Sequence, residues 1–256
     1  MLIDLNSDMG ESFGAWKMGE DDEMLEIVTS ANIACGFHAG DPDVMFKTLS
    51  AAKANGVGAG AHPSFMDIQG FGRRQILGES PAQLERQIVY QIGALKALAE
   101  SMGYPLQHVK THGAMGNMAA EDPQLAMAVA KAIHSVDPSL IMVVMPGMET
   151  EKAAEKIGLR LVREIYADRA YTETGALVSR KLPGAVIHDP QQAATRVMQM
   201  LESRAIITLD GKKLPTRIDS ICVHGDTPGA VEMARQLRTL LEGNGLTLAS
   251  MAKVIA

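Results

Sequence analysis

The chain has 256 residues, of which 46% are hydrophobic, and it carries a formal net charge of −6 at pH 7. A chain of this length can bury a large core without disulfides or a structural metal. Its acidic balance, with no basic stripe, argues against nucleic acid or an anionic membrane as the main partner.

Apolar runs, the N-terminal residues and the two cysteines bear on the cellular location of the protein. No apolar run approaches the ~20 residues that span a bilayer. Residues 1–4 enter a strand pattern without the basic and apolar regions of a secretion signal. Cys35 and Cys222 are far apart in the sequence and fit reduced, buried thiols. We therefore expect a cytoplasmic protein.

Strands and helices are predicted to alternate along the whole chain. Apolar runs predict strands at residues 2–5, 30–35, 57–61, 108–110, 140–145, 159–165 and 218–223. Apolar residues at helical spacing predict helices at residues 41–55, 80–103, from 122 onward, 149–157, 189–203 and 227–242. The pair Asp210-Gly211 predicts a hairpin between residues 206–209 and 212–215.

The predicted helices share a start signal, a capping side chain followed by proline at the first helical position. It occurs at Asp41-Pro42, Ser80-Pro81, Asp122-Pro123, Asp189-Pro190 and Thr227-Pro228. Repeated units of strand, polar loop and helix indicate an α/β fold with a parallel sheet. About seven evenly spaced strands favour a closed or nearly closed βα barrel over an open doubly wound sheet. Because no linker interrupts the pattern, we expect residues 1–256 to form a single domain.

Polar side chains that could carry chemistry follow the predicted strand ends. His38 is the clearest case, because Gly36 and Gly40 flank it and a helix cap follows. In a barrel the carboxyl ends of the strands converge on one mouth, so histidines after four different strands predict a shared active site. The side chains at these ends are Asp8, Glu11, His38, Asp41, His62, Lys110, His112, Asp168, Arg169, His224 and Asp226. His134 and His188 are expected to be structural.

Three chemistries could use such a mouth. Asp8, His38 and His62 could bind a divalent metal that activates water, although the sequence has neither HxxxH nor HExxH spacing. The same groups could act as acids and bases without a metal. The mouth could instead bind a polar ligand whose carboxylate or phosphate is held by cations, with candidates Arg73, Arg74, Lys110 and Arg169. The chain contains neither a P-loop sequence nor a nucleophile elbow.

The motifs themselves resemble those of a known family. They are residues 4–11 (DLNSDMGE), 29–41 (TSANIACGFHAGD), 60–65 (GAHPSF), 70–74 (GFGRR), 167–171 (ADRAY) and 222–230 (CVHGDTPGA). On these motifs the chain resembles the LamB/YcsF family over nearly its whole length. The resemblance implies a seven-stranded βα barrel, a distorted TIM-like fold related to the polysaccharide deacetylases.

The resemblance also implies an activity. It is the opening of the lactam of 5-oxo-L-proline to L-glutamate at the expense of ATP, with Mg²⁺, together with 5-oxoprolinase subunits B and C. The expected catalytic groups are Asp8, Glu11, His38, Asp41, His62, His112 and His224. Asp8, Glu11, His38 and His62 would orient and deprotonate water, and His112 or His224 would protonate the leaving nitrogen. Substrate or phosphate would be bound by Arg73, Arg74, Lys110, Asp168, Arg169 and Asp226.

Two alternatives to this activity stay open on the sequence. One is a metal-dependent amide hydrolase of deacetylase type that needs no ATP. The other is a non-catalytic component that binds a small acid and supports its partners. A departure from the family pattern bears on the substrate: residues 110–117 read KTHGAMGN, where the family usually has KPHGALYN. Lys110 and His112 match, whereas Thr111 and Gly116 stand where the family has proline and tyrosine, so the shape of the pocket, and with it the substrate, stays open here.

Overall fold

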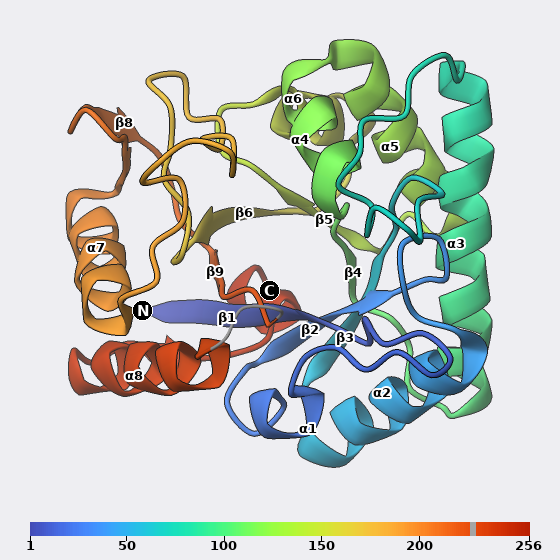
Figure 1. The fold of residues 1–256 in the computed structure, drawn as a ribbon, viewed down its shortest axis with the longest axis horizontal. Helices are drawn as coiled ribbons and strands as arrows, with labels where there is room; N and C mark the ends of the chain where they lie inside the picture. The colour runs from blue at the N-terminus through green and yellow to red at the C-terminus, as the bar shows by residue number, and fades with distance from the viewer. Residues whose placement is uncertain (226–228) are drawn as a thin grey trace.

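Seven parallel strands close into a barrel in the computed structural model, which describes residues 1–225 and 229–256 (Figure 1). Neighbours follow chain order, and the last barrel strand, β9, pairs with both β6 and β1, which closes the ring. The barrel strands are β1 (Leu2–Met9), β2 (Ser30–Ala34), β3 (Gly58–His62), β4 (His108–Val109), β5 (Ile141–Val144), β6 (Leu161–Tyr166) and β9 (Ser220–Cys222). The predicted seven-stranded parallel βα barrel is therefore confirmed.

Helices pack around the outside of the barrel (Figure 1). They are α1 (Asp21–Met24), α2 (Pro42–Asn55), α3 (Pro81–Ser101), α4 (Gly113–Glu121), α5 (Pro123–Val136), α6 (Glu149–Ile157), α7 (Pro190–Ser203), α8 (Ala230–Gly243) and α9 (Met251–Val254). The predicted start signal is confirmed for α2, α3, α5 and α7, because the capping side chain accepts a backbone N–H of the first turn and proline follows it. The fifth signal, Thr227-Pro228, lies outside the described residues.

The structure differs from the predicted elements in several places. β1 runs to Met9, so Asp8 lies within the strand rather than in a loop after it. α4 begins directly after His112, where a glycine-containing segment gives no clear helical pattern. At the C-terminal end, β10 (Thr247–Leu248) pairs with β1. The hairpin predicted at Asp210-Gly211 is confirmed, and its strands are β7 (Ala205–Ile207) and β8 (Lys213–Pro215).

The two faces of the barrel strands differ in chemistry. Successive side chains of a strand point to opposite sides, and the outward ones, such as Leu5 and Ile221, are buried in the apolar core beneath the helices. Several inward side chains are instead polar and hydrogen-bond across the barrel. They are Asp4, Asn6, Asp8, Asn32, His108, Glu164 and Ser220. A buried polar column therefore fills much of the barrel axis.

The C-terminal segment covers the amino-terminal end of the barrel. Met251 of α9 packs against Ile141, Val143 and Val162, all of them buried. The Met251 backbone N–H also donates a hydrogen bond to the Ser30 hydroxyl, at 3.2 Å. The polar column is thus covered at this end, and it meets the cavity described below at the other.

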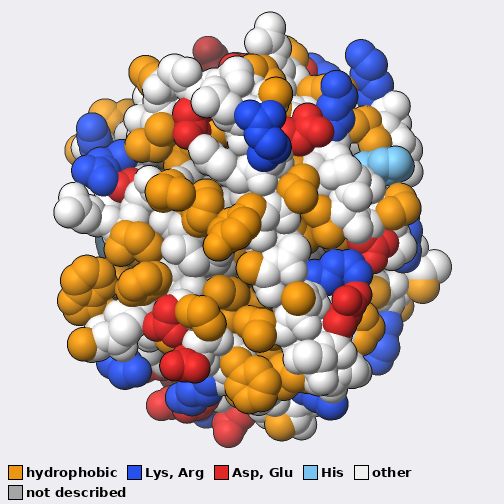
Figure 2. Space-filling model, turned by 90° about the vertical axis from the view of Figure 1, so that its right-hand side faces the viewer, with side chains coloured by type: hydrophobic (Ala, Val, Ile, Leu, Met, Phe, Trp, Pro, Cys, Tyr) orange, Lys and Arg blue, Asp and Glu red, His pale blue; other side chains and the backbone are white. Residues whose placement is uncertain are grey.

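The outer surface is mixed in character. Figure 2 shows the face that carries α3, where apolar side chains lie among charged ones, and Tyr90 of α3 is 66% exposed. The Tyr90 and Phe37 rings lie 5.6 Å apart, which ties α3 to the loop that carries His38. Within residues 1–225 and 229–256, no helix is both long enough and apolar enough to cross a bilayer.

Candidate active site

A cavity of about 820 Å³ lies over the carboxyl ends of the barrel strands. Its wall includes Asp8 of β1, His62 of β3, Lys110 and His112 just after β4, and His224 just after β9. Ligand sites commonly have volumes of roughly 300–1,000 Å³. The barrel therefore brings strand-end residues that are far apart in sequence to one cavity of ligand-binding size.

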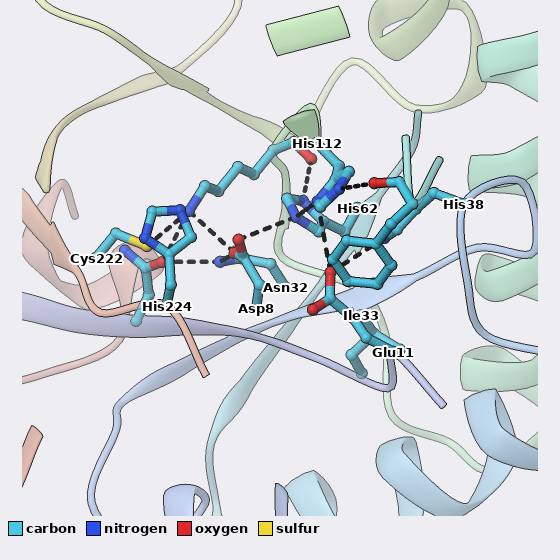
Figure 3. A network of polar contacts seen from close by, with 12 residues as sticks. Asp8, Glu11, Asn32, Ile33, His38, His62, His112, Cys222 and His224 are labelled. Atoms are coloured by element: carbon cyan, nitrogen blue, oxygen red, sulfur yellow. Dashed lines mark hydrogen bonds and ion pairs between the residues drawn. The ribbon is translucent and has the colours of Figure 1, made fainter. Parts of the chain in front are cut away.

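Glu11, His38, His62 and His112 lie together on one side of this cavity (Figure 3), and we call them the imidazole cluster. Glu11 Oε1 lies 3.1 Å from His38 Nε2 and 3.4 Å from His112 Nδ1. His112 Nδ1 lies 3.1 Å from His62 Nε2. The His38 and His112 rings stack, with centroids 3.8 Å apart and planes at 5°. One nitrogen or carboxylate oxygen from each residue lies within 4.8 Å of the other three, so the four could hold a metal ion.

Backbone carbonyls fix the orientation of two of these rings. His62 Nδ1–H donates to the Lys110 carbonyl at 2.7 Å, and His112 Nε2–H donates to the Phe71 carbonyl at 2.9 Å. Phe71 has a φ of 54°, a left-handed conformation that a bulky residue adopts only when its surroundings impose it. At Gly72, which follows, a Cβ atom would lie 2.7 Å from His112 Cδ2. The loop can therefore pack against the cluster because this residue is glycine.

Burial controls the charge of the imidazole cluster. It lowers the pKa of His38 well below the usual value, and the neighbouring His112 and His62 lower it further. The pKa of His112 is likewise well below its usual value, because of burial first and His62 second. Neutral imidazoles offer lone pairs to a metal or a proton. At neutral pH these two side chains are therefore neutral rings rather than cations.

Asp8, Lys110, Glu164 and Cys222 form a second group, which we call the lysine cluster. Lys110 Nζ lies 3.0 Å from Asp8 Oδ1, 3.1 Å from Glu164 Oε1 and 3.0 Å from Cys222 Sγ. Burial disfavours the ammonium, but Asp8, Cys222 and Glu164 outweigh burial and raise the pKa of Lys110 well above its usual value. Burial would raise the pKa of Asp8, yet His62 and Lys110 hold it well below the usual value. A charged pair is thus maintained inside the barrel mouth.

Amide side chains support the lysine cluster from within the barrel. Asn32 Nδ2 donates to Asp8 Oδ1 at 2.8 Å and to Asn6 Oδ1 at 2.7 Å, and His108 Nε2–H donates to Asn32 Oδ1 at 2.8 Å. Burial lowers the pKa of His108 to about 3, so the ring is neutral. A Cβ atom at Gly60 would collide with this ring, which explains glycine there. The chain of amides fixes the direction in which the Asp8 carboxylate points.

Asp4 ends the polar column on the side away from the cavity. Its carboxylate accepts hydrogen bonds from the hydroxyls of Thr29, Ser30 and Ser220. Burial raises its pKa to about 6, although these hydroxyls oppose the shift. Asp4 therefore affects the stability of the barrel rather than the chemistry of the cavity.

His224 and Asp168 form a third arrangement at the wall. His224 Nδ1 lies 2.8 Å from Asp168 Oδ2, and the His224 ring stacks on Tyr166 at a centroid distance of 5.4 Å. Burial would raise the pKa of Asp168, but His224 outweighs it and keeps the pKa below the usual value. A carboxylate that holds one ring nitrogen fixes the tautomer and leaves the other nitrogen for proton transfer.

Most of the predicted strand-end residues meet at or next to the cavity. They are Asp8, Glu11, His38, His62, Lys110, His112, Asp168 and His224. The sequence suggests Asp8, His38 and His62 as a metal-binding trio. In the structure Glu11 and His112 lie with His38 and His62, whereas Asp8 pairs with Lys110. Asp41 is not brought to the cavity, since its carboxylate accepts the backbone N–H groups of Gly14, Asp43 and Val44 and caps α2. Asp226 lies outside the described residues.

The predicted cationic residues differ in their surroundings. Arg73 lines the cavity, and its guanidinium lies 5.0 Å from the Phe71 ring centroid. Arg74 also lines the cavity and is paired with Asp67. Arg169 lines it too, but it is buried and donates to the Val178 carbonyl at 2.7 Å, which gives it a structural role in its loop.

Sequence reasoning missed the polar residues inside the strands. Asn6, Asn32 and Glu164 support Asp8 and Lys110, although the apolar runs around them predict only ordinary buried strands. The alternation Asp4-Leu5-Asn6-Ser7-Asp8 contains the signal, because an inward-facing polar residue recurs at every second position. Arg180 and Lys181, which also line the cavity, lie in a loop that the sequence pattern leaves unassigned.

Together the fold and the cavity define a class. Carboxylates, imidazoles and an ammonium converge at the carboxyl end of a parallel βα barrel, the end at which barrel enzymes carry their active sites. Residues 3–256 match the LamB/YcsF family, and the chain belongs to that family.

Comparisons with individual proteins agree with this assignment. The chain is 53% identical over 252 residues to a Rhodopseudomonas palustris protein named as the A subunit of 5-oxoprolinase, covering 98% of this chain and 99% of that protein. The crystal structure of the lactam utilization protein from Thermus thermophilus superposes with a TM-score of 0.91 at 44% identity, covering 98% and 100% of the two chains. A more distant similarity is to the catalytic domain of a peptidoglycan N-acetylglucosamine deacetylase from Eubacterium rectale. The two are 10% identical, with a TM-score of 0.51 over 97% of this chain and 87% of that chain, so they share the fold alone.

Proposed function

We propose that this chain is the A subunit of an ATP-dependent 5-oxoprolinase, which opens the lactam of 5-oxo-L-proline to L-glutamate together with subunits B and C. The observation that carries the proposal is the 53% identity to the A subunit of a 5-oxoprolinase over nearly the full length of both chains. The likeness to a lactam utilization protein supports the same class of substrate.

The chemistry of the substrate explains why ATP is needed. A five-membered lactam is stabilised by resonance, and its hydrolysis at neutral pH is unfavourable. Transfer of a phosphoryl group to the carbonyl oxygen makes the carbon electrophilic. Water then adds to this carbon, the ring C–N bond breaks as the nitrogen gains a proton, and a second water releases phosphate from the resulting acyl phosphate. The chain must therefore supply a base for water and an acid for nitrogen.

The cavity wall offers both groups. We assign the base to Asp8, which is held ionised by Lys110 and whose Oδ2 lies 3.2 Å from His62 Nε2. We assign the acid to His224, whose ring Asp168 orients. General acid–base catalysis by a positioned side chain typically contributes about 10²–10⁴-fold in rate. In this assignment Lys110 maintains the charge of Asp8 rather than binding substrate.

The cations around the cavity fit the negative groups of the reacting molecule. Arg73, Arg180 and Lys181 line it, and guanidinium and ammonium groups bind carboxylates and phosphates through charge-assisted hydrogen bonds. We assign to this cavity the phosphorylated lactam, with its carboxylate and phosphoryl group facing these cations. The ATP-consuming step itself is assigned to the assembled complex with subunits B and C.

The test is the release of glutamate from 5-oxo-L-proline by the purified chain, with and without subunits B and C and with and without Mg-ATP. We expect glutamate only when the partners and ATP are all present, and turnover lowered by at least about 10²-fold for Asp8→Asn. Glu202→Gln, an exposed acid on α7, is the matched control and should retain full turnover. No glutamate from the complete wild-type mixture would contradict the function. Undiminished turnover of the Asp8→Asn complex would contradict the role of Asp8.

A further inference from the structure

We propose that Arg180 binds the carboxylate of the lactam substrate and thereby selects substrates that carry an acidic group beside the ring nitrogen. The inference rests on the proposed function and deepens it, because it assigns one cation of the cavity to one end of the substrate. Arg180 then sets specificity, whereas Asp8 and His224 act on the reacting atoms.

The first observation is that Arg180 has no partner in the part of the chain that the structure describes. The residue lines the cavity and is half-buried, but it makes no hydrogen bond or ion pair within residues 1–225 and 229–256. Other cations of the wall differ, because Lys110 and Arg74 are paired with carboxylates and Arg169 donates to backbone carbonyls. A guanidinium presents several N–H donors in one plane, which suits it to bind a carboxylate in two places. Arg180 is therefore available to a ligand.

The second observation is that the backbone around Arg180 is tied to the barrel mouth. Arg180 belongs to the segment between β6 and α7, which is amber in Figure 1. Arg169 Nη2–H donates to the Val178 carbonyl at 2.7 Å, and the Val178 N–H donates to the carbonyl of the residue after Arg169 at 2.9 Å. The Leu182 N–H then donates to the Ser179 carbonyl at 2.9 Å, which closes a turn around Arg180. Contacts on both sides thus hold Arg180 at the cavity wall.

The third observation is the positive charge of this part of the wall. Burial lowers the pKa of Arg169 below its usual value, and the neighbouring charge of Arg180 lowers it further. Asp168 opposes this shift without cancelling it, and its carboxylate already lies 2.8 Å from His224 Nδ1. Two guanidinium groups therefore share a carboxylate that is also engaged by a histidine. An incoming anion would find a favourable charge here.

The covalent structure of the substrate relates this wall to the reaction. In 5-oxo-L-proline the ring nitrogen is bonded on one side to the carbonyl carbon and on the other to the carbon that bears the carboxylate. The group that protonates this nitrogen therefore has the carboxylate close to it. His224 is the assigned acid, Asp168 holds its ring, and Arg180 lies close enough to Asp168 for their charges to interact. A carboxylate beside Arg180 leaves the carbonyl carbon facing Asp8, whereas the reverse orientation would bring two carboxylates together.

A phosphoryl group is the other anion that Arg180 could bind. It is transferred to the carbonyl oxygen, which in this orientation lies on the side of Asp8 and the imidazole cluster. Arg73 lies on that side, since its guanidinium is 5.0 Å from the Phe71 ring, which contacts His112 edge to face. The orientation therefore assigns the phosphoryl group to the side of Arg73 and the carboxylate to Arg180.

The test is the steady-state kinetics of the complex with subunits B and C, assembled with wild-type chain or with Arg180→Ala. Loss of a charged hydrogen-bond partner should raise the KM for 5-oxo-L-proline by at least about 10-fold. The kcat and the KM for Mg-ATP should change little, because the carboxylate does not react. Methylguanidinium at millimolar concentration should lower the raised KM again. Arg160→Ala, which removes an exposed arginine directly before β6, is the matched control and should behave like the wild type.

Three results would overturn the inference while leaving the proposed function intact. They are an unchanged KM for 5-oxo-L-proline in the Arg180→Ala complex, a rise in the KM for Mg-ATP in its place, and a raised KM that methylguanidinium does not lower. If Arg180→Ala does not fold, Arg180→Lys takes its place, because it keeps the charge but loses the planar donors, and its KM should rise by a smaller factor. No glutamate from the wild-type complex would contradict the proposed function, and this inference with it.

Discussion

Two groups of polar side chains lie beside one cavity but satisfy their electrostatics in opposite ways. In the lysine cluster an internal ammonium lies between the carboxylates of Asp8 and Glu164. In the imidazole cluster, burial keeps His38 and His112 neutral, and their nitrogens converge with a carboxylate. Polar residues at a barrel mouth therefore do not form one uniform site. One group is built around a buried ammonium, and the other around neutral imidazoles.

The two groups also differ in what positions them. The lysine cluster stands on β1, β6 and β9 and on the residue after β4, so closure of the barrel places its members. The imidazole cluster depends on loops, on the left-handed Phe71 and on the close approach of Gly72. We therefore expect the first to respond mainly to changes of charge and the second mainly to changes of packing.

The largest effect is expected for Lys110→Met. Removing one partner of a buried ion pair leaves charge uncompensated and typically costs about 3–5 kcal/mol, and here two buried carboxylates lose their cation. Urea unfolding at neutral pH should show a loss of this size or failure to fold. Lys131→Met, which changes an exposed lysine of α5, should have little effect. A loss below about 1 kcal/mol for Lys110→Met would mean that the ammonium does not hold this cluster together.

The second largest effect is expected in the pH dependence of stability, which depends on Asp4 in the polar column below both clusters. The folded-state pKa of Asp4 is raised from 3.8 to about 6, so the folded state holds its proton where the unfolded chain has released it. Stability should therefore fall as pH rises from about 4 to about 6, by roughly 3 kcal/mol in total. The measurement is the difference in unfolding free energy between wild type and Asp4→Asn across this range. A difference that does not change with pH would show that Asp4 is not protonated on folding.

A smaller effect is expected for Gly72→Ala, which tests the packing of the imidazole cluster. The added methyl group would collide with Ser64 and the ring of His112, and overpacking typically costs about 1–3 kcal/mol. Gly78→Ala is the matched control, because Gly78 also has a positive φ, of 94°, but nothing lies within 4 Å of the added atom. The two variants should differ by the packing cost in unfolding experiments. Equal losses would attribute the effect to backbone conformation alone.

The smallest effect is expected for Asp41→Ala. Loss of a helix N-cap typically costs about 1 kcal/mol, and Asp41 accepts three backbone N–H groups at the start of α2 and in the loop beside it. The reconstituted complex should release glutamate at an unchanged rate. A fall in turnover of about 10-fold or more in folded Asp41→Ala would approach the effect of losing a general acid or base. That result would support the catalytic role that the sequence suggests for Asp41.

The sequence predicts the barrel well because its signals are local and repeated. Proline-capped helix starts such as Ser80-Pro81 and short apolar strands recur along the chain, and parallel strands place their polar ends together. This is why the sequence alone points to the strand-end residues Asp8, His38, His62, His112 and His224. Which of them group together could not be predicted, because that depends on how far each loop reaches and on where Lys110 extends.

Two further features lay beyond the sequence for physical reasons. Asn32 and Glu164 lie in segments that the sequence predicts as ordinary buried strands, so their polar, inward face is visible only once the barrel is closed. Asp41 combines a position near a strand end with the chemistry of a helix cap, and the sequence alone does not separate these roles. Tertiary contacts decide both cases.

The most direct test of the difference between the two clusters is nitrogen NMR of the chain with ¹⁵N-labelled histidine at neutral pH. We predict neutral rings for His38 and His112, with the His112 proton on Nε2, matching its hydrogen bond to the Phe71 carbonyl. Doubly protonated His38 and His112 rings at neutral pH would contradict this difference, because the imidazole cluster would then carry its own cations.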